Sequence, residues 1–176
     1  MGRMISQKAR YAFKALIALS ASRPDECRQA RDIATSEQIP QSFLEQILLE
    51  LRRAGLVGSR RGREGGHFLL KDPADITFGH VLRLIDGPVA PLPCLSRTAY
   101  RRCHDCKDEN TCAMRRGFGW AYDATLQVLE QTSIADACAG RSASDYRSVV
   151  PSATRKRPSE HKAGSQRQAR KRYLTK

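Results

Sequence analysis

Four cysteines crowd into 19 positions of a 176-residue chain, and their spacing is the strongest chemical signal in the sequence. They follow the pattern Cys94-x8-Cys103-x2-Cys106-x5-Cys112, with His104 between the middle pair. Thiolates are the ligands that soft and borderline metals select, so four of them in one loop can converge on a single ion or a small cluster. The pattern therefore predicts a metal or redox site formed by these four cysteines.

Three kinds of site are compatible with this spacing. A structural zinc site usually has two paired C-x-x-C knuckles, whereas only Cys103 and Cys106 form such a pair here. The spacing favours an iron–sulfur cluster, of the 2Fe–2S or 4Fe–4S type, over zinc. The third kind is a metal-free thiol switch that forms disulfides on oxidation. Arg101, Arg102 and Lys107 flank the cysteines, and they either lower the thiol pKa values or form a solvated surface.

The segment upstream of the cysteines, residues 40–70, reads as an amphipathic helix, a glycine stop and a short hairpin. Apolar residues recur at helical spacing, which buries one face and leaves the polar residues near the helix start outward. Gly55 follows the last periodic residues and suits a left-handed C-terminal cap. Residues 56–60 and 67–71 can then pair as two strands around a tip rich in arginine and glycine. This order is typical of a winged helix-turn-helix that binds DNA.

The expected DNA-contacting residues fall into two groups. Outward side chains at the helix start would meet base edges, whereas arginines of the hairpin would meet phosphates. These residues are Gln41, Ser42, Glu45 and Gln46 on the helix, and Arg60, Arg61 and Arg63 on the wing. Ser42 and Glu45 also match an S-x-x-E capping box, so this pair either caps the helix or points into the major groove.

Further helices flank this segment on both sides. Residues 6–21 form an amphipathic helix with Ser6 as its N-cap, and residues 29–36 form a second, short helix. Residues 77–86 form a fourth helix, which ends where three prolines lie within residues 88–93. Its buried face is expected to hold Val81, Leu82 and Ile85.

A long helix is predicted after the cysteines, from Ala113 to Ala139. Its apolar stripe either dimerises the protein or packs on its own domain, and the two roles are compatible. The predicted fold class is mainly α, a winged helix-turn-helix head with a small β-hairpin wing and a long C-terminal dimerisation helix. The segments are residues 1–90 as the DNA-binding domain, 91–112 as a cysteine-rich sensor loop, 113–140 as the dimerisation helix and 141–176 as a disordered basic tail.

Positive charge is concentrated at the C-terminal end. Residues 1–140 carry 20 Lys and Arg against 16 Asp and Glu, whereas residues 141–176 carry 11 against 2. The last segment thus holds 9 of the 13 net positive charges, and it has too few large apolar residues to offset its ordering entropy. Such a tail either adds salt-sensitive attraction to DNA of any sequence or is solvated without a specific role.

Several other classes of protein are disfavoured. No window approaches 18 consecutive apolar residues, so we expect no membrane partner and a cytoplasmic location. In that reducing compartment structural disulfides are rare, and the isolated Cys27 is expected to be a bystander thiol. The sequence has no glycine-rich phosphate loop, paired carboxylates or nucleophile with a base at suggestive spacing, so no enzyme is predicted. An iron–sulfur carrier or electron-transfer protein is the alternative class, but it would not need an arginine-tipped wing.

These motifs resemble the Rrf2 family of bacterial transcription regulators, which includes iron–sulfur, nitric-oxide and iron sensors. The resemblance covers residues 4 to about 138 and rests on MISQKARYAFKALIALS, on IPQSFLEQILLELRRAGLVGSRRGREGGHFLL with its RG-x-x-GG wing motif, and on ITFGHVLRLIDG. It implies a homodimeric repressor or activator that binds double-stranded DNA at a short palindromic operator, often with an iron–sulfur cluster held by three cysteines. Those three cysteines match Cys94, Cys106 and Cys112, and DNA contacts match Ser42, Glu45 and Arg61.

The sequence departs from the family pattern at the fourth ligand. Some relatives use an aspartate where this chain has Arg10, and others use a histidine where it has Arg115. Cys103 is then the expected fourth ligand, with His104 second. Gln38 stands where relatives often have glycine in the turn of the helix-turn-helix, which would cost about 1 kcal/mol if that residue adopts a positive φ.

Overall fold

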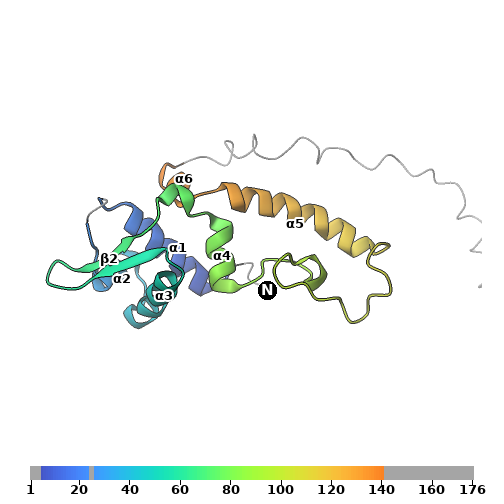
Figure 1. Ribbon diagram of the computed structural model, residues 1–176, viewed down its shortest axis with the longest axis horizontal. Helices are drawn as coiled ribbons and strands as arrows, with labels where there is room; N and C mark the ends of the chain where they lie inside the picture. Colours follow the sequence, from blue (N-terminus) through green and yellow to red (C-terminus); the bar gives the residue numbers. More distant parts are fainter. Residues whose placement is uncertain (1–4, 24–25, 141–176) are drawn as a thin grey trace, which may run out of the picture.

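The computed structural model describes residues 5–23 and 26–140, so the expected basic tail, residues 141–176, lies outside the described residues. Within them the predicted fold class is confirmed, because the chain is mainly helical with one two-stranded antiparallel hairpin (Figure 1). The elements in chain order are α1 (Gln7–Ser20), α2 (Ala30–Glu37), α3 (Gln41–Arg53), β1 (Val57–Arg60), β2 (Gly66–Leu69), η1 (Pro73–Asp75), α4 (Phe78–Asp86), η2 (Pro93–Leu95), α5 (Ala113–Gln131) and α6 (Ile134–Cys138). No helix in the described ranges combines the length and apolar character needed to cross a bilayer.

The core of the head forms around α1, which begins at its predicted N-cap. The Ser6 hydroxyl accepts a hydrogen bond from the Ala9 amide at 3.0 Å, satisfying one free donor of the first turn. Small alanines on α1 are fully buried and let neighbouring helices approach closely. The fully buried large side chains of the head are Leu16, Ile33, Leu44, Ile47, Leu48, Leu51, Leu56, Ile76, Val57, Val81 and Ile134.

The buried face of α4 differs in one residue from the expectation. Val81 and Leu82 are buried as predicted. Ile85 is only half-buried, because it lies in the last turn of α4 and packs against the edge of the core rather than within it. Gly87 ends the helix with φ of 81°, a conformation that favours glycine, just before the proline-rich segment.

The C-terminus of α3 has the predicted glycine cap. Gly55 has φ of 71°, its amide donates to the Arg52 carbonyl, and the Leu56 amide donates to the Leu51 carbonyl, each at 3.0 Å. These two bonds form a Schellman motif and direct the chain into β1.

Of the two roles considered for Ser42 and Glu45, the capping box at the N-terminus of α3 is absent. Pro40 is the N-cap residue and α3 begins at Gln41, so Ser42 is already inside the helix. Proline fits this boundary because its fixed φ suits the entry to a helix. Glu45 instead accepts a hydrogen bond from the Gln41 side chain at 2.9 Å, between residues one turn apart. The outward side chains of Gln41 and Glu45 are therefore bonded to each other and do not cap the helix backbone.

The wing is present as predicted, but its strands are one residue shorter each, and the second begins one residue earlier. β1 and β2 pair antiparallel with Val57 opposite Leu69 and Arg60 opposite Gly66. The segment at Arg28 pairs with the free edge of β2 through an antiparallel backbone bridge with His67. A side chain at Gly66 would meet the Arg28 carbonyl oxygen at 2.5 Å, which explains the last glycine of the wing motif.

The single helix expected from Ala113 to Ala139 is wrong beyond Gln131. α5 ends at Gln131, and α6 starts at Ile134 after an extended Thr132 and Ser133. The Ser133 hydroxyl and the Asp136 carboxylate form a capping box for α6. The Phe78 amide also donates to the Thr132 carbonyl at 2.8 Å, and this bond competes with continuation of the helix. The chain thereby returns to the head, where α6 packs on α1 (Figure 1).

Candidate DNA-binding surface and cysteine loop

The helix-turn-helix consists of α2 and α3 joined by a turn at Gln38. This residue adopts φ of 55° and ψ of 48°. The turn therefore has the positive φ that would suit glycine best, although glutamine occupies the position. The following Ile39 is buried, and its amide donates to the Ala34 carbonyl at 2.9 Å. The turn is thus held by an apolar anchor and a backbone bond.

The side chains expected to read bases share one exposed surface of α3, while the opposite surface is buried. The exposed residues are Gln41, Ser42, Glu45 and Gln46. The Gln41–Glu45 hydrogen bond orients one donor and one acceptor together near the start of the helix. Such a pair has the chemistry to contact base edges in a major groove.

The three wing arginines are all exposed but occupy two different places. Arg60 ends β1, and its guanidinium donates to the Cys27 sulfur at 3.1 Å. Cys27, expected to be a bystander, is therefore a contact of the wing root, and no sequence pattern indicates it. Arg61 and Arg63 lie in the tip, whose tight turn is closed by a bond from the Gly65 amide to the Gly62 carbonyl at 3.0 Å. The tip thus presents two cations on a short loop.

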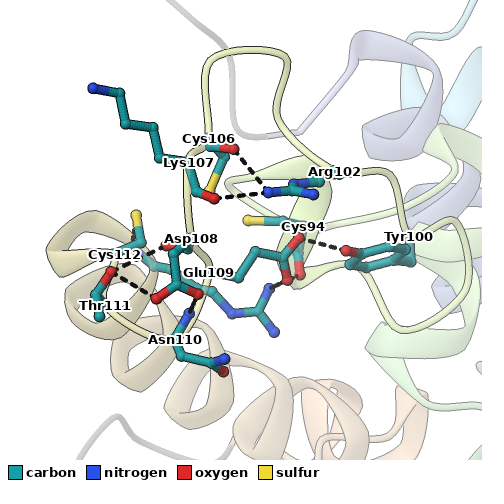
Figure 2. Close-up of polar contacts among 11 residues, drawn as sticks. Cys94, Tyr100, Arg102, Cys106, Lys107, Asp108, Glu109, Asn110, Thr111 and Cys112 are labelled. Carbon is teal, nitrogen blue, oxygen red and sulfur yellow. Dashed lines mark hydrogen bonds and ion pairs between the residues drawn. The ribbon is translucent and has the colours of Figure 1, made fainter.

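The four predicted cysteine ligands lie in one loop that leads into α5, and Figure 2 shows three of them, Cys94, Cys106 and Cys112. Cys94 is in η2 and only 4% exposed. Cys103 and Cys106 are half-buried in the irregular segment that follows. Cys112 is the N-cap of α5, and its sulfur accepts from the Arg115 amide at 3.4 Å. The loop therefore connects the end of the head to the first turn of α5.

The thiols of this loop influence one another electrostatically. The pKa of Cys103 is raised, first by a side-chain hydrogen bond with Cys94 and then by burial. The pKa of Cys106 is raised mainly by burial and then by the charge of Cys112, and Arg102 only partly opposes this. The flanking cations therefore do not produce a net lowering of these two thiol pKa values. In the described part of the chain, no three His, Cys, Asp or Glu side chains are grouped closely enough to hold a metal ion.

A polar network that the sequence did not indicate holds the loop (Figure 2). Arg115 of α5 donates to the Cys94 carbonyl at 2.6 Å and to the Glu109 carboxylate at 2.8 Å. The other oxygen of Glu109 accepts from the Tyr100 hydroxyl, and this bond raises the pKa of Tyr100. Arg115, at the position where the family resemblance implies a histidine ligand in some relatives, thus joins Cys94, Glu109 and, through Glu109, Tyr100 to α5.

Arg102 and Asp108 fix the remainder of the loop. The Arg102 guanidinium donates to the carbonyls of Cys106 and Lys107 at 3.0 and 2.9 Å. Asp108 accepts from the Asn110 amide and the Thr111 hydroxyl, each at 3.0 Å, and the Asn110 bond is the main cause of its lowered pKa. Arg102 therefore supports the backbone beside Cys106. This role differs from both roles considered for the flanking cations, which were to lower the thiol pKa values or to form a solvated surface.

Comparison with known proteins decides the family. Residues 5–140 match the model of the Rrf2 family, which is described as an iron-dependent transcriptional regulator. The chain belongs to the Rrf2 family. It is 46% identical over 136 residues to an rrf2-like HTH-type transcriptional regulator of Rhodobacter capsulatus, covering 76% of this chain and 91% of that protein. It is 33% identical over 132 residues to the HTH-type transcriptional regulator CymR of Bacillus subtilis, covering 75% and 87% respectively.

Solved structures of Rrf2 regulators have the same fold. CymR, the global cysteine regulator of B. subtilis, superposes with a TM-score of 0.66 at 30% identity, covering 81% of this chain and all of that one. IscR of T. potens shows the same fold at 24% identity, with a TM-score of 0.62 over 80% of this chain and 89% of its own. As an Rrf2 protein, the chain is a DNA-binding transcriptional regulator and not an enzyme. This membership also decides against the carrier or electron-transfer alternative.

Proposed function

We propose that this Rrf2 protein binds a palindromic operator as a homodimer and senses redox, iron or nitric-oxide status through its cysteine loop. Cys94, Cys103, Cys106 and Cys112 would hold an iron–sulfur cluster. The single observation that carries the proposal is the continuity between the loop and α5. Cys112 caps α5, and Arg115 of the same helix is bonded to the carbonyl of Cys94. A change in the loop would therefore act on the helix that returns to the DNA-binding head.

The donor set fits a cluster in its chemistry. Four thiols in one loop are soft donors, and the electrostatic influence of Cys94 and Cys112 on Cys103 and Cys106 indicates that they are neighbours. Because they are not yet grouped as ligands, the loop would have to contract around the cofactor. When bound, a cluster would supply a response to oxidants, nitric oxide or iron supply.

Regulation would follow from a population shift. Two recognition helices of a dimer must match half-sites about one DNA turn apart, so a small change in their separation alters affinity. Glu130 of α5 forms an ion pair with Arg83 of α4. α4 in turn packs on α1, which contacts α3. This series of contacts gives the loop and α5 a route to the recognition helix.

A metal-free thiol switch is the second candidate. It is favoured by the absence of a ready ligand group in the described residues and by the influence of Cys94 on the pKa of Cys103, since two thiols that interact could form a disulfide on oxidation. A related structure, 26% identical to this chain, is that of Staphylococcus aureus CymR in an oxidized form. Zinc bound by the same thiols is the remaining alternative.

One experiment separates these candidates. The ultraviolet–visible spectrum of anaerobically purified protein would be recorded, with iron, sulfide and zinc measured on the same sample. We expect iron and sulfide together with visible absorption, and DNA affinity that changes when the cofactor is removed. Zinc alone would support the structural-metal alternative, and neither metal after anaerobic reconstitution would leave the thiol switch as the leading function.

The homodimer is proposed to form along α5. Tyr122 and Leu126 of the predicted apolar stripe are turned into the protein's own fold, whereas Met114 and Phe118 are 61% and 45% exposed. We expect Phe118→Asp to weaken dimerisation at least about tenfold, because a charge would be buried without a partner. Sedimentation at several protein concentrations measures this. Asp123→Asn, at an exposed site on the same helix, is the control, and equal dimer affinity in Phe118→Asp and wild type would reject this interface.

Substitutions of base-reading and of phosphate-binding residues should change DNA binding in different ways. Arg61→Ala is expected to weaken binding to specific and random duplexes alike, because it removes a phosphate contact. Glu45→Ala is expected to reduce discrimination between them by about 1–3 kcal/mol, because the Gln41–Glu45 pair loses its acceptor. Anisotropy titrations with an operator enriched from a random pool measure both, with Arg116→Ala as an exposed arginine control. Equal loss of discrimination in both variants would contradict this division of roles.

A further inference from the structure

A histidine of the wing, beside the place where β1 packs on α3, has no role in the proposed function. His67 lies in β2, directly after the glycines of the wing motif. Its Nδ1 atom is the one buried side-chain nitrogen or oxygen of residues 5–23 and 26–140 that lacks a hydrogen-bond partner. Buried polar atoms are almost always satisfied, so an exception next to a DNA-binding helix indicates a partner that arrives later.

Backbone pairing places the His67 side chain toward α3. The His67 amide donates to the Arg28 carbonyl at 2.7 Å, and the Arg28 amide donates back at 2.9 Å. His67 and Ser59, which are opposite one another in the wing, therefore form a non-hydrogen-bonded pair, in which side chains lie closest. Both lie on the same face of the hairpin as the buried Val57, which is the face that packs on α3.

Arg52 of α3 completes this group. It lies in the last turn of α3, and its guanidinium donates to the Ser59 hydroxyl at 3.2 Å. Arg52 and Ser59 are exposed, while His67 is half-buried. A guanidinium, a hydroxyl and an imidazole, all of them hydrogen-bond donors, thus meet between the recognition helix and the wing.

The charges around His67 favour its neutral form in the free protein. Its pKa is lowered, mainly by burial and then by the positive charge of Arg52, while Glu45 acts in the opposite direction. Both charged groups belong to α3. β1 places the uncharged Val57 and Ser59 on this face, and the Arg28 guanidinium is bonded to the Ala18 carbonyl at 3.1 Å. An anion that neutralised Arg52 would therefore remove one of the two causes of the lowering.

We propose that Arg52, Ser59 and His67 form a binding site for one backbone phosphate of DNA, and that His67 takes a proton from solvent when the phosphate binds. This inference rests on the proposed function. In a complex with α3 in the major groove and the wing beside it, one DNA strand would run between the two elements, and a phosphate of that strand would lie near these three side chains. Its oxygens accept hydrogen bonds, and its charge stabilises imidazolium beside Arg52. DNA binding by this head is thereby linked to uptake of a proton.

The test measures DNA affinity as a function of pH. Full-length protein is titrated at constant salt with a labelled duplex enriched from a random-sequence pool, between pH 8 and pH 6. Uptake of one proton changes affinity by at most about tenfold per pH unit near the pKa of the group, so we expect binding to become about three- to tenfold tighter across this range. His67→Gln keeps a polar side chain that does not titrate, and it should remove most of this slope. His80→Gln, which replaces a histidine of α4 away from the wing, should retain it.

A second measurement does not depend on a variant that folds. The imidazole resonances of His67 in wild-type protein report its pKa directly by NMR, free and with the same duplex. We expect the pKa to lie below its ordinary value in the free protein and to rise on DNA binding. An unchanged pKa, or equal pH slopes in wild type and His67→Gln, would overturn the inference. Failure to bind any duplex at any pH would instead refute the proposed DNA-binding surface.

Discussion

Alanine at any one of Cys94, Cys103, Cys106 or Cys112 is expected to prevent the protein from retaining a full iron–sulfur cluster. The loop supplies these thiols from one short segment, and both positions that carry a fourth ligand in some relatives are arginines here. Loss of a direct ligand should exceed the roughly 10–100-fold loss of metal affinity that removal of an outer-shell partner typically costs. Iron and sulfide content and the visible spectrum after anaerobic reconstitution measure the effect, and DNA affinity should change with them.

Two cysteines outside the loop serve as matched controls. Cys27 accepts a bond from Arg60 at the wing root, and the Cys138 sulfur lies 3.0 Å from the Ser20 hydroxyl. Figure 1 shows that α6, which carries Cys138, lies at the opposite end of α5 from the cysteine loop. Alanine at either position should leave metal content and spectrum unchanged, so general damage by cysteine removal can be distinguished from loss of a ligand.

The Cys103→Ala variant decides whether Cys103 is the fourth ligand. Family resemblance assigns three ligands to Cys94, Cys106 and Cys112, whereas the fourth rests on reasoning about what remains in the loop. The influence of Cys94 on the pKa of Cys103 supports the four-cysteine arrangement. A full and equally stable cluster in Cys103→Ala would show that the fourth ligand is His104 or an external thiol. Arg115 is poorly suited to that role, because an arginine carries no acceptor and stays protonated.

The head could be predicted from the sequence because its signals are local. The periodic face of α3 and Gly55 at its end fix the helix and its exit, and the alternation of glycine and arginine fixes the wing. Each of these features follows from neighbouring residues and their allowed φ and ψ values. The exposed surface of α3 could be assigned for the same reason, since a helix with one buried face leaves the other in solvent.

Capping boxes show where local reasoning ends. The pattern S-x-x-E at Ser42 is compatible with a cap that does not exist, because Pro40 is the N-cap residue and Ser42 lies inside the helix. The pattern S-x-x-D at Ser133 does cap a helix, α6. What distinguishes the two is a contact distant in sequence, the backbone bridge between Thr77 and Ser133. Helical spacing of apolar residues continues across this break, so periodicity alone predicted one helix where there are two.

The polar network of the cysteine loop could not be predicted for a related reason. Tyr100, Glu109 and Arg115 form bonds that depend on how an irregular segment folds over the first turn of α5. No period of hydrophobic residues constrains such a segment, and charged side chains in a loop look alike whether they are paired or solvated. The departure at Arg115 from the family's histidine was the available signal, and its structural role emerges only from the contacts.

Ile134→Ala is expected to lower the free energy of unfolding by about 2–5 kcal/mol, the range for removal of a fully buried aliphatic side chain. Ile134 is completely buried in the head core although it lies beyond the long helix. Its amide also donates to the Ile76 carbonyl at 2.9 Å, so α6 closes the core beside α1 and η1. The cost therefore comes from a cavity at the place where the chain rejoins the DNA-binding domain.

Ile17→Ala is the matched control for this substitution. Ile17 lies on α1 with 36% of its surface exposed, and its removal should cost less than that of Ile134, because less apolar area is buried and solvent can fill the space left. Urea unfolding of both variants and wild type, at one protein concentration and without cofactor, gives the comparison, because dimerisation and metal binding shift apparent stability. If the long helix instead continued past Ser133, Ile134 would project from the head into solvent or a partner, and the two variants would unfold with similar midpoints in dilute protein. A much larger loss of stability in Ile134→Ala than in Ile17→Ala would thus identify α6 as part of the head core.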